Sequence, residues 1–282
     1  MLGLGILIFR FWVPESPRWL MVHGQPRQAE EIVTGIEAKV RARGGLLPAL
    51  PAAVTRLRVR DRTPWPEIWQ AIAHTHRRRS ILGLSLMASQ AFFYNSLLFT
   101  YALVLTRFYD VPPERVSSYF LPLALGNALG PILIGRLFDV IGRKPMIVIT
   151  YAASGILMAL SGWLFQAGLL TAQTQALAWC VTFFIASAAA SSAYLTVSEI
   201  FPLEIRGLAI SIFYAAGTLA GGVGAPLIFG WLIGTGSRGY RFGGYLLGAF
   251  LMVAASLVEA WLGVKAERQP LESIADPLSA AA

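Results

Sequence analysis

Long apolar runs separated by short polar stretches dominate the chain, and six of these runs are long enough to cross a lipid bilayer. A transmembrane helix needs about 20 mostly apolar residues. We therefore predict an all-α integral membrane protein with six transmembrane helices. The predicted spans are residues 81–106, 116–138, 145–167, 176–198, 207–234 and 243–264.

Two further segments precede the first full span. Residues 1–13 are apolar, but they are too short to span a bilayer and have neither the charged segment nor the cleavage site of a signal peptide. We expect them to be the second half of a helix whose first half is missing. Residues 14–79 form a long polar loop in which Ala29, Ile32 and Ile36 recur at helical spacing, which predicts an amphipathic helix on the membrane or bundle surface.

The composition excludes an ordinary soluble domain. Hydrophobic residues make up 56% of the chain and charged residues 13%, with a mean hydropathy of +0.60. A soluble domain carries about 25% charged residues. The one cysteine, Cys180, excludes an intrachain disulfide framework and any metal site built from several thiolates.

The basic residues lie mainly on one side of the predicted spans, which gives the expected orientation. Twelve of the 23 lysines and arginines lie between Arg18 and Arg79. Because cytoplasmic loops carry the excess of lysine and arginine, we expect the more basic side to face the cytoplasm. The protein is then expected to be a multi-pass protein of the plasma membrane. The net charge of +8 then reflects topology and lipid attraction, not nucleic-acid binding. The segments expected in the cytoplasm are 14–79, 135–145, 198–207 and the tail, 265–282.

Enzyme signatures are nearly absent. The chain has no G-x-x-x-x-G-K-[ST] phosphate loop, and no G-x-G-x-x-G follows a strand. His74 and His76 are two residues apart on a predicted helix, so they face different directions and lack a third ligand. We therefore expect a solvated pair of histidines, no catalytic residues, no metal site and no cofactor.

Small residues within the spans are expected to serve packing. The pairs Gly126-x-x-x-Gly130 and Gly217-x-x-x-Gly221 have the spacing that lets two transmembrane helices approach closely. Cys180 lies in the middle of a span, where a free cysteine behaves as a small apolar side chain. None of these five residues is expected to be a site.

One loop between two spans carries a dense motif, G-R-L-F-D-V-I-G-R-K, at residues 135–144. Asp139 ends one helix, Gly142 permits a tight turn, and Arg143 and Lys144 open the next helix. A carboxylate at that depth costs a few kcal/mol unless it is paired. We expect Asp139 to pair with an arginine or to cap a neighbouring helix N-terminus, as a lock that breaks when the helix pairs slide apart.

The motif G-x-x-x-D-x-x-G-R-K between two spans resembles the inter-helix loop of the major facilitator superfamily, whose members have twelve helices in two halves. Residues 14–20 are similar to the segment that ends helix six in the sugar-porter-like branch, and residues 198–207 to its loop between helices ten and eleven. The resemblance covers essentially the whole chain. It implies the C-terminal six-helix half of such a transporter, with 1–13 as the end of helix six, 14–79 as the central cytoplasmic loop and 80–264 as helices seven to twelve.

The same resemblance implies two sets of functional residues. Charged residues at the inner face tie the two halves together when the cytoplasmic side is closed, and a pattern similar to the sugar-porter sequence Q-Q-x-x-G-x-N lies in the first full span. The implied gate residues are Glu15, Arg18, Gly135, Arg136, Asp139, Gly142, Arg143, Lys144, Glu199 and Arg206. The implied substrate-binding residues are Gln90, Tyr94, Asn95 and Tyr194.

The solute site carries a geometric condition. Gln90 and Asn95 match the pattern, but Ser89 and Phe93 replace a glutamine and a glycine. Five residues at about 100° each place Gln90 and Asn95 about 140° apart on an ideal helix. We therefore expect both to face the solute only if the span is bent or unwound near Phe93, as it is in the family.

The implied function is secondary transport of a small solute, such as a sugar or an organic acid, by alternating access. The expected partners are the solute, the bilayer, a proton as coupling ion, and the missing N-terminal half. A half-size carrier that acts as a homodimer and a non-transporting fragment or assembly module are the alternatives. No acid lies at mid-membrane, and we expect Glu259, near the cytoplasmic end of the last span, to be an interfacial or paired acid.

Overall fold

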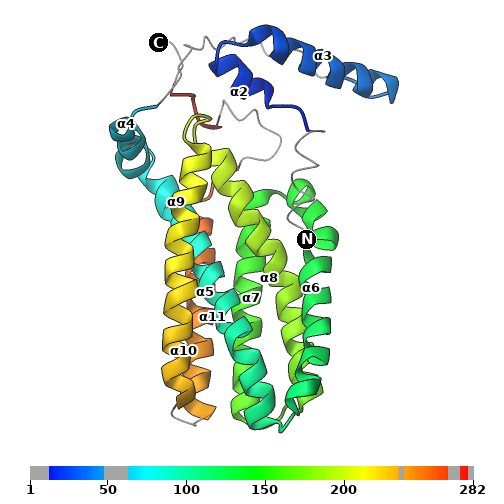
Figure 1. Ribbon diagram of the computed structural model, residues 1–282, viewed down its shortest axis with the longest axis vertical. Coiled ribbons are helices and arrows are strands. Elements are labelled where there is room, and N and C mark those ends of the chain that lie inside the picture. Colours follow the sequence, from blue (N-terminus) through cyan, green and yellow to red (C-terminus); the bar gives the residue numbers. More distant parts are fainter. Residues whose placement is uncertain (1–12, 48–62, 235–237, 266–273, 279–282) are drawn as a thin grey trace.

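Six long spans run side by side in the computed structural model, which describes residues 13–47, 63–234, 238–265 and 274–278 (Figure 1). No strand occurs in these ranges, and six helical stretches are long and apolar enough to cross a membrane. The predicted all-α fold with six spans is therefore confirmed. The expected partial helix at residues 1–13 lies outside the described residues except for Val13.

The spans are joined by short turns and preceded by short helices. One span is composite, because α9, η2 and α10 run on as a single stretch, Arg206–Leu232. The π-helical turn η2 precedes Pro226, which has no N–H to donate to the preceding turn. The elements are α2 (Pro17–Val22), α3 (Pro26–Ala42), α4 (Trp65–Gln70), η1 (Ala71–Thr75), α5 (Arg77–Phe108), α6 (Pro113–Val140), α7 (Arg143–Gln166), α8 (Ala172–Ile200), α9 (Arg206–Thr218), η2 (Leu219–Gly224), α10 (Ala225–Gly234) and α11 (Arg238–Leu262).

The turns between spans follow from local chemistry. Gly142 has a φ of +113°, which a residue with a side chain rarely adopts, and it separates α6 from α7 in two residues. At the other end of the bundle, Thr171 caps α8 through a capping box with Thr174.

Glycines let two pairs of spans approach closely, α6 with α8 and the α9–η2 span with α5. A Cβ atom placed on Gly126 or Gly130 of α6 would lie 2.5 or 2.0 Å from a backbone oxygen of α8, and one on Gly217 or Gly221 would lie 2.9 or 2.3 Å from backbone atoms of α5. The prediction that both glycine pairs are packing faces is confirmed. Cys180 packs beside Gly126, as expected of a small apolar side chain.

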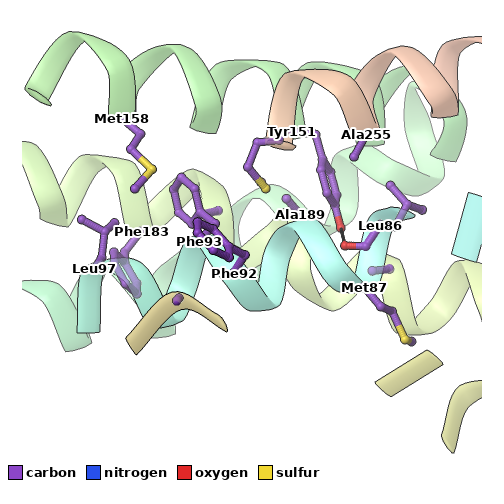
Figure 2. Packing of buried hydrophobic residues seen from close by; sticks show 14 of the residues in the cluster. Leu86, Met87, Phe92, Phe93, Leu97, Tyr151, Met158, Phe183, Ala189 and Ala255 are labelled. Atoms are coloured by element: carbon purple, nitrogen blue, oxygen red, sulfur yellow. Dashed lines mark hydrogen bonds between the residues drawn. The ribbon is translucent and has the colours of Figure 1, made fainter. Parts of the chain in front are cut away.

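The core lies where α5, α7 and α8 meet. Figure 2 shows Phe93 of α5 among other large apolar side chains and Tyr151 of α7 reaching toward α5. The Tyr151 hydroxyl donates a hydrogen bond to the carbonyl oxygen of Leu86 at 3.0 Å. Phe93 is fully buried, so the side chain that stands where the resembled pattern has glycine packs into the core of the bundle. The helix that carries it, α5, is continuous.

We call the end of the bundle that carries α4, the α6–α7 turn and the α8–α9 turn the loop-bearing end (Figure 1). Here Arg79 donates one hydrogen bond to the Ile200 carbonyl at 2.6 Å and another to the Ile274 carbonyl at 2.7 Å. Glu204 accepts a third from the Leu278 amide at 3.0 Å. Residues 274–278 of the tail therefore join the ends of α5 and α8.

Candidate functional site

A polar cavity of about 490 Å³ lies between α5, α6, α8 and the α9–η2 span. The structure brings all four predicted substrate-binding residues to its wall. None of the side chains that form this wall is charged. They belong to Gln90, Ala91, Tyr94, Asn95, Asn127, Pro131, Ser187, Ala190, Ser191, Tyr194, Tyr214, Thr218 and Gly222.

The condition that α5 must be bent or unwound near Phe93 for both amides to face one space was too strict. The helix is continuous from Arg77 to Phe108, yet both Gln90 and Asn95 line the cavity. Counted at about 100° per residue, Tyr94 and Ala91 fall between these two positions within one arc of about 140°. The cavity contacts residues across this arc, so a continuous helix presents both Gln90 and Asn95 to it. The Asn95 side chain meanwhile donates to the Ala91 carbonyl of its own helix at 2.8 Å.

Five polar residues of the cavity wall were not among the predicted site residues: Asn127, Ser187, Ser191, Tyr214 and Thr218. Asn127 of α6 accepts a hydrogen bond at 2.9 Å from the hydroxyl of Tyr94. Tyr214 of α9 lies with its ring 6.2 Å from the ring of Tyr194. The signal for Asn127 was an amide within an otherwise apolar stretch of a span, which is uncommon in a membrane. Tyr214 gave no such signal, because tyrosine is common in spans.

A second cavity, of about 250 Å³, adjoins the first on the side of the loop-bearing end. The two share Pro131 and Ser191 in their walls. Gly135, Asp139 and Arg143 from the sequence motif line the second cavity. The motif residues therefore lie next to the polar cavity, between it and the loop-bearing end.

Arg143 is the centre of the charged cluster at this end. Its guanidinium contacts the Glu199 carboxylate and lies 3.7 Å from Asp139. The Glu199 side chain is 13% exposed and that of Asp139 is 70% exposed. Charge pairs gain strength as they lose contact with water, so Glu199 is the main partner of Arg143 within this half.

The other predicted gate residues lie around this cluster or apart from it. Lys144 is half-buried next to Arg143, Arg136 is exposed on α6, and Arg206 donates to the Phe201 carbonyl at 3.4 Å. Glu15 and Arg18 are exposed, just before and within α2, a helix that packs on α3. The structure therefore groups Asp139, Arg143 and Glu199 but does not bring Glu15 and Arg18 to them.

Glu259 was expected to be an interfacial or paired acid, and the described structure gives its carboxylate no pairing partner. Its side chain is 1% exposed, and neither carboxylate oxygen has a hydrogen-bond partner in the described part of the chain. The helix face that carries it also buries Met252, Ala255 and Ser256, because this face packs on α7. Closeness in sequence to the end of a span did not predict this burial.

The two histidines also differ from the expected solvated pair. His74 is exposed, whereas His76 is half-buried with its ring edge-on to Phe201 at 6.0 Å. Burial lowers the pKa of His76, and the nearby Arg79 lowers it further. Within the ranges that the structure describes, no three histidine, cysteine or acidic side chains come together as a metal site would require.

Comparisons with known proteins agree with this architecture. A family model described as "Sugar (and other) transporter" matches residues 1–276. The chain is 26% identical over 244 residues to the putative metabolite transport protein YwtG of Bacillus subtilis (75% of this chain, 47% of that protein). It is 25% identical over 276 residues to sugar transporter ERD6-like 16 of Arabidopsis thaliana (90% and 54%). The chain thus spans about half the length of the curated relatives it matches.

A solved structure has the same fold. The proton:xylose symporter XylE, a major facilitator superfamily protein bound to 6-bromo-6-deoxy-D-glucose, superposes with a TM-score of 0.69 at 22% identity. The match covers 96% of this chain and 56% of that one. The six spans described above therefore correspond to about half of a major facilitator fold.

Proposed function

Because the chain belongs to the sugar (and other) transporter family of the major facilitator superfamily, we propose that it forms one six-helix half of a secondary transporter. The transporter moves a small polar solute by alternating access, with a proton as the coupling ion. The observation that supports this best is the polar cavity between α5, α6, α8 and the α9–η2 span. Transporters of this kind bind solute near mid-membrane, between their two structural repeats.

The chemistry of the cavity wall favours a neutral solute over an organic acid. Its polar groups are amides and hydroxyls, such as those of Gln90, Asn127 and Thr218, and none of the wall residues is cationic. A buried anion without a cationic partner is strongly disfavoured. Amides and hydroxyls instead match the hydroxyl groups of a sugar or a similar polyol, and the rings of Tyr194 and Tyr214 offer it apolar surface.

The proposed orientation places the loop-bearing end in the cytoplasm of a plasma-membrane protein. The basic residues of α3 and of the first turn of α5 lie at this end, in keeping with the excess of lysine and arginine in cytoplasmic loops. In this orientation the cluster of Asp139, Arg143 and Glu199 lies on the cytoplasmic side of the cavity. The contacts within this cluster can then form when the cytoplasmic side is closed and break when it opens.

The chain by itself should not transport. Half of a two-repeat site leaves the polar faces of α5 and α8 turned toward lipid or toward a second copy. We expect the purified 282-residue chain in liposomes to show no saturable uptake of radiolabelled xylose, glucose or citrate, and uptake to appear when a preceding six-helix half is joined to it. Saturable uptake by the chain alone would instead establish the homodimeric carrier.

Within a two-half transporter, Gln90→Ala should raise the apparent solute affinity constant about fivefold, which matches the loss of one hydrogen bond worth about 1 kcal/mol. Asn95→Ala should have a smaller effect, because the Asn95 amide already donates within its own helix. Ser89→Ala is the matched control, since Ser89 is buried, donates to the Leu86 carbonyl and is absent from the cavity wall. Concentration-dependent uptake measures all three, and equal affinity in wild type and Gln90→Ala would remove α5 from the solute site.

A further inference from the structure

Glu259 of α11 is a buried acid that the proposed solute site does not use. Its side chain is 1% exposed, and both carboxylate oxygens lack a hydrogen-bond partner among the described residues. An ionised carboxylate without a partner is far less stable in a low-dielectric interior than in water, and such a group takes up a proton instead. An unsatisfied buried acid in a native fold calls for a functional explanation.

The first turn of α7 lies beside this part of α11, because the two helices pack against each other in opposite directions. Ser256, three residues before Glu259, donates to the carbonyl of Val148, four residues after Lys144, at 2.9 Å, which brings Lys144 and Glu259 to the same level of the two helices. The described structure contains no ion pair between them, and their opposite charges attract through space. Tyr151, about two turns further along α7, already donates its hydroxyl to the Leu86 carbonyl of α5 (Figure 2). Lys144 is therefore the group whose position a charge on Glu259 would change.

The position of Glu259 gives protons a short path to the aqueous phase. Glu259 lies near the last residue of α11, Leu262, about one helical turn from the loop-bearing end. Gly263 lies against the carboxyl, since a Cβ atom placed on it would be 2.4 Å from an oxygen of Glu259. A residue with no side chain thus separates the acid from that surface.

The first turn of α7 connects this acid to the charged cluster. Lys144 follows directly after Arg143, which contacts Glu199 of α8. A pull on Lys144 toward α11 therefore acts on the same turn that holds Arg143 against α8. Attraction of Lys144 toward α11 and attraction of Arg143 toward α8 therefore pull the first turn of α7 in different directions.

We propose that Glu259 is a proton-binding site that controls the Arg143–Glu199 contact. With a proton from the aqueous phase on its carboxyl, Glu259 is neutral and the first turn of α7 stays with α8. When the proton returns to the aqueous phase, the carboxylate draws Lys144 toward α11 and weakens the contact of Arg143 with Glu199. The site is a property of this chain and does not depend on the identity of the solute.

Infrared spectroscopy of the purified 282-residue chain in detergent tests the proton site directly. We expect the carbonyl stretch of a protonated carboxylic acid, shifted in D₂O and by ¹³C-labelling of glutamate, which fades as the pH rises. Glu259→Gln should remove this band, whereas Glu114→Gln, which alters an exposed acid in the first turn of α6, should leave it. A wild-type spectrum without the band, or a band unaffected by Glu259→Gln, would overturn the proposal.

Lys144 provides a second arm that leaves the acid in place. Lys144→Gln removes the cation that favours ionisation, so the band should persist to a higher pH, and Lys144→Arg should restore the wild-type titration. This arm keeps the test decisive even where Glu259→Gln does not fold. An identical titration in wild type and Lys144→Gln would refute the link between Glu259 and the first turn of α7.

Discussion

Gly130→Ala should prevent the six-helix bundle from reaching its native packing, although the change adds a single carbon. The added Cβ would lie 2.0 Å from the Phe184 carbonyl oxygen and 2.2 Å from the Ser187 hydroxyl. The hydroxyl can rotate away, but the carbonyl belongs to the backbone of α8, so α6 and α8 must separate. We expect a loss of at least about 3 kcal/mol, the upper range for overpacking a well-packed core.

Gly230→Ala is the matched control, because Gly230 lies in α10 and no heavy atom comes within 4 Å of its added Cβ. There the change should be neutral or stabilising by up to about 1 kcal/mol, the helix propensity gain of alanine over glycine. Thermal unfolding in detergent, followed by tryptophan fluorescence and size-exclusion chromatography, measures both variants. Equal stability of Gly130→Ala and Gly230→Ala would mean that α6 and α8 do not pack as closely as described.

Glu199→Gln should slow transport more than it weakens solute binding in a two-half transporter. The substitution leaves Arg143 without its main partner in a partly buried position, and it changes none of the cavity wall residues. A shift of about 1–3 kcal/mol in a conformational equilibrium corresponds to about a 5- to 150-fold change in populations. We therefore expect turnover to fall by about tenfold or more, with the affinity constant changed by less than about twofold.

Asp139→Asn should have a smaller effect than Glu199→Gln, since Asp139 is 70% exposed and 3.7 Å from Arg143. Exposed pairs of this kind contribute about 1 kcal/mol or less. Glu114→Gln, an exposed acid at the opposite end of the bundle, is the control for charge alone. Initial rates of counterflow and net uptake separate turnover from binding, and a larger effect of Asp139→Asn would assign the lock to the sequence motif instead of to Glu199.

The polar cavity brings together residues that the sequence pattern had already selected. Gln90 and Asn95 were identified from that pattern, and a bend in α5 was set as the condition for both to face one space, because their directions differ by about 140°. In the structure α5 is one continuous helix, and the cavity contacts residues over the whole arc. Phe93, at the position where the resembled pattern has glycine, is fully buried.

The sequence by itself determined the all-α fold and the six spans, because a bilayer offers no hydrogen-bond partner to the backbone and forces long apolar runs into helices. It also determined the turn at Gly142 and the close-packing glycines, which depend on local backbone geometry and on side-chain size. The tertiary structure alone decided that Glu199 is the partner of Arg143, that Asn127 joins the cavity, and that Glu259 is buried with no hydrogen-bond partner among the described residues. These features depend on which faces of separate helices meet, and because nearly every face of a transmembrane helix is apolar, its sequence gives little indication of which face packs inward.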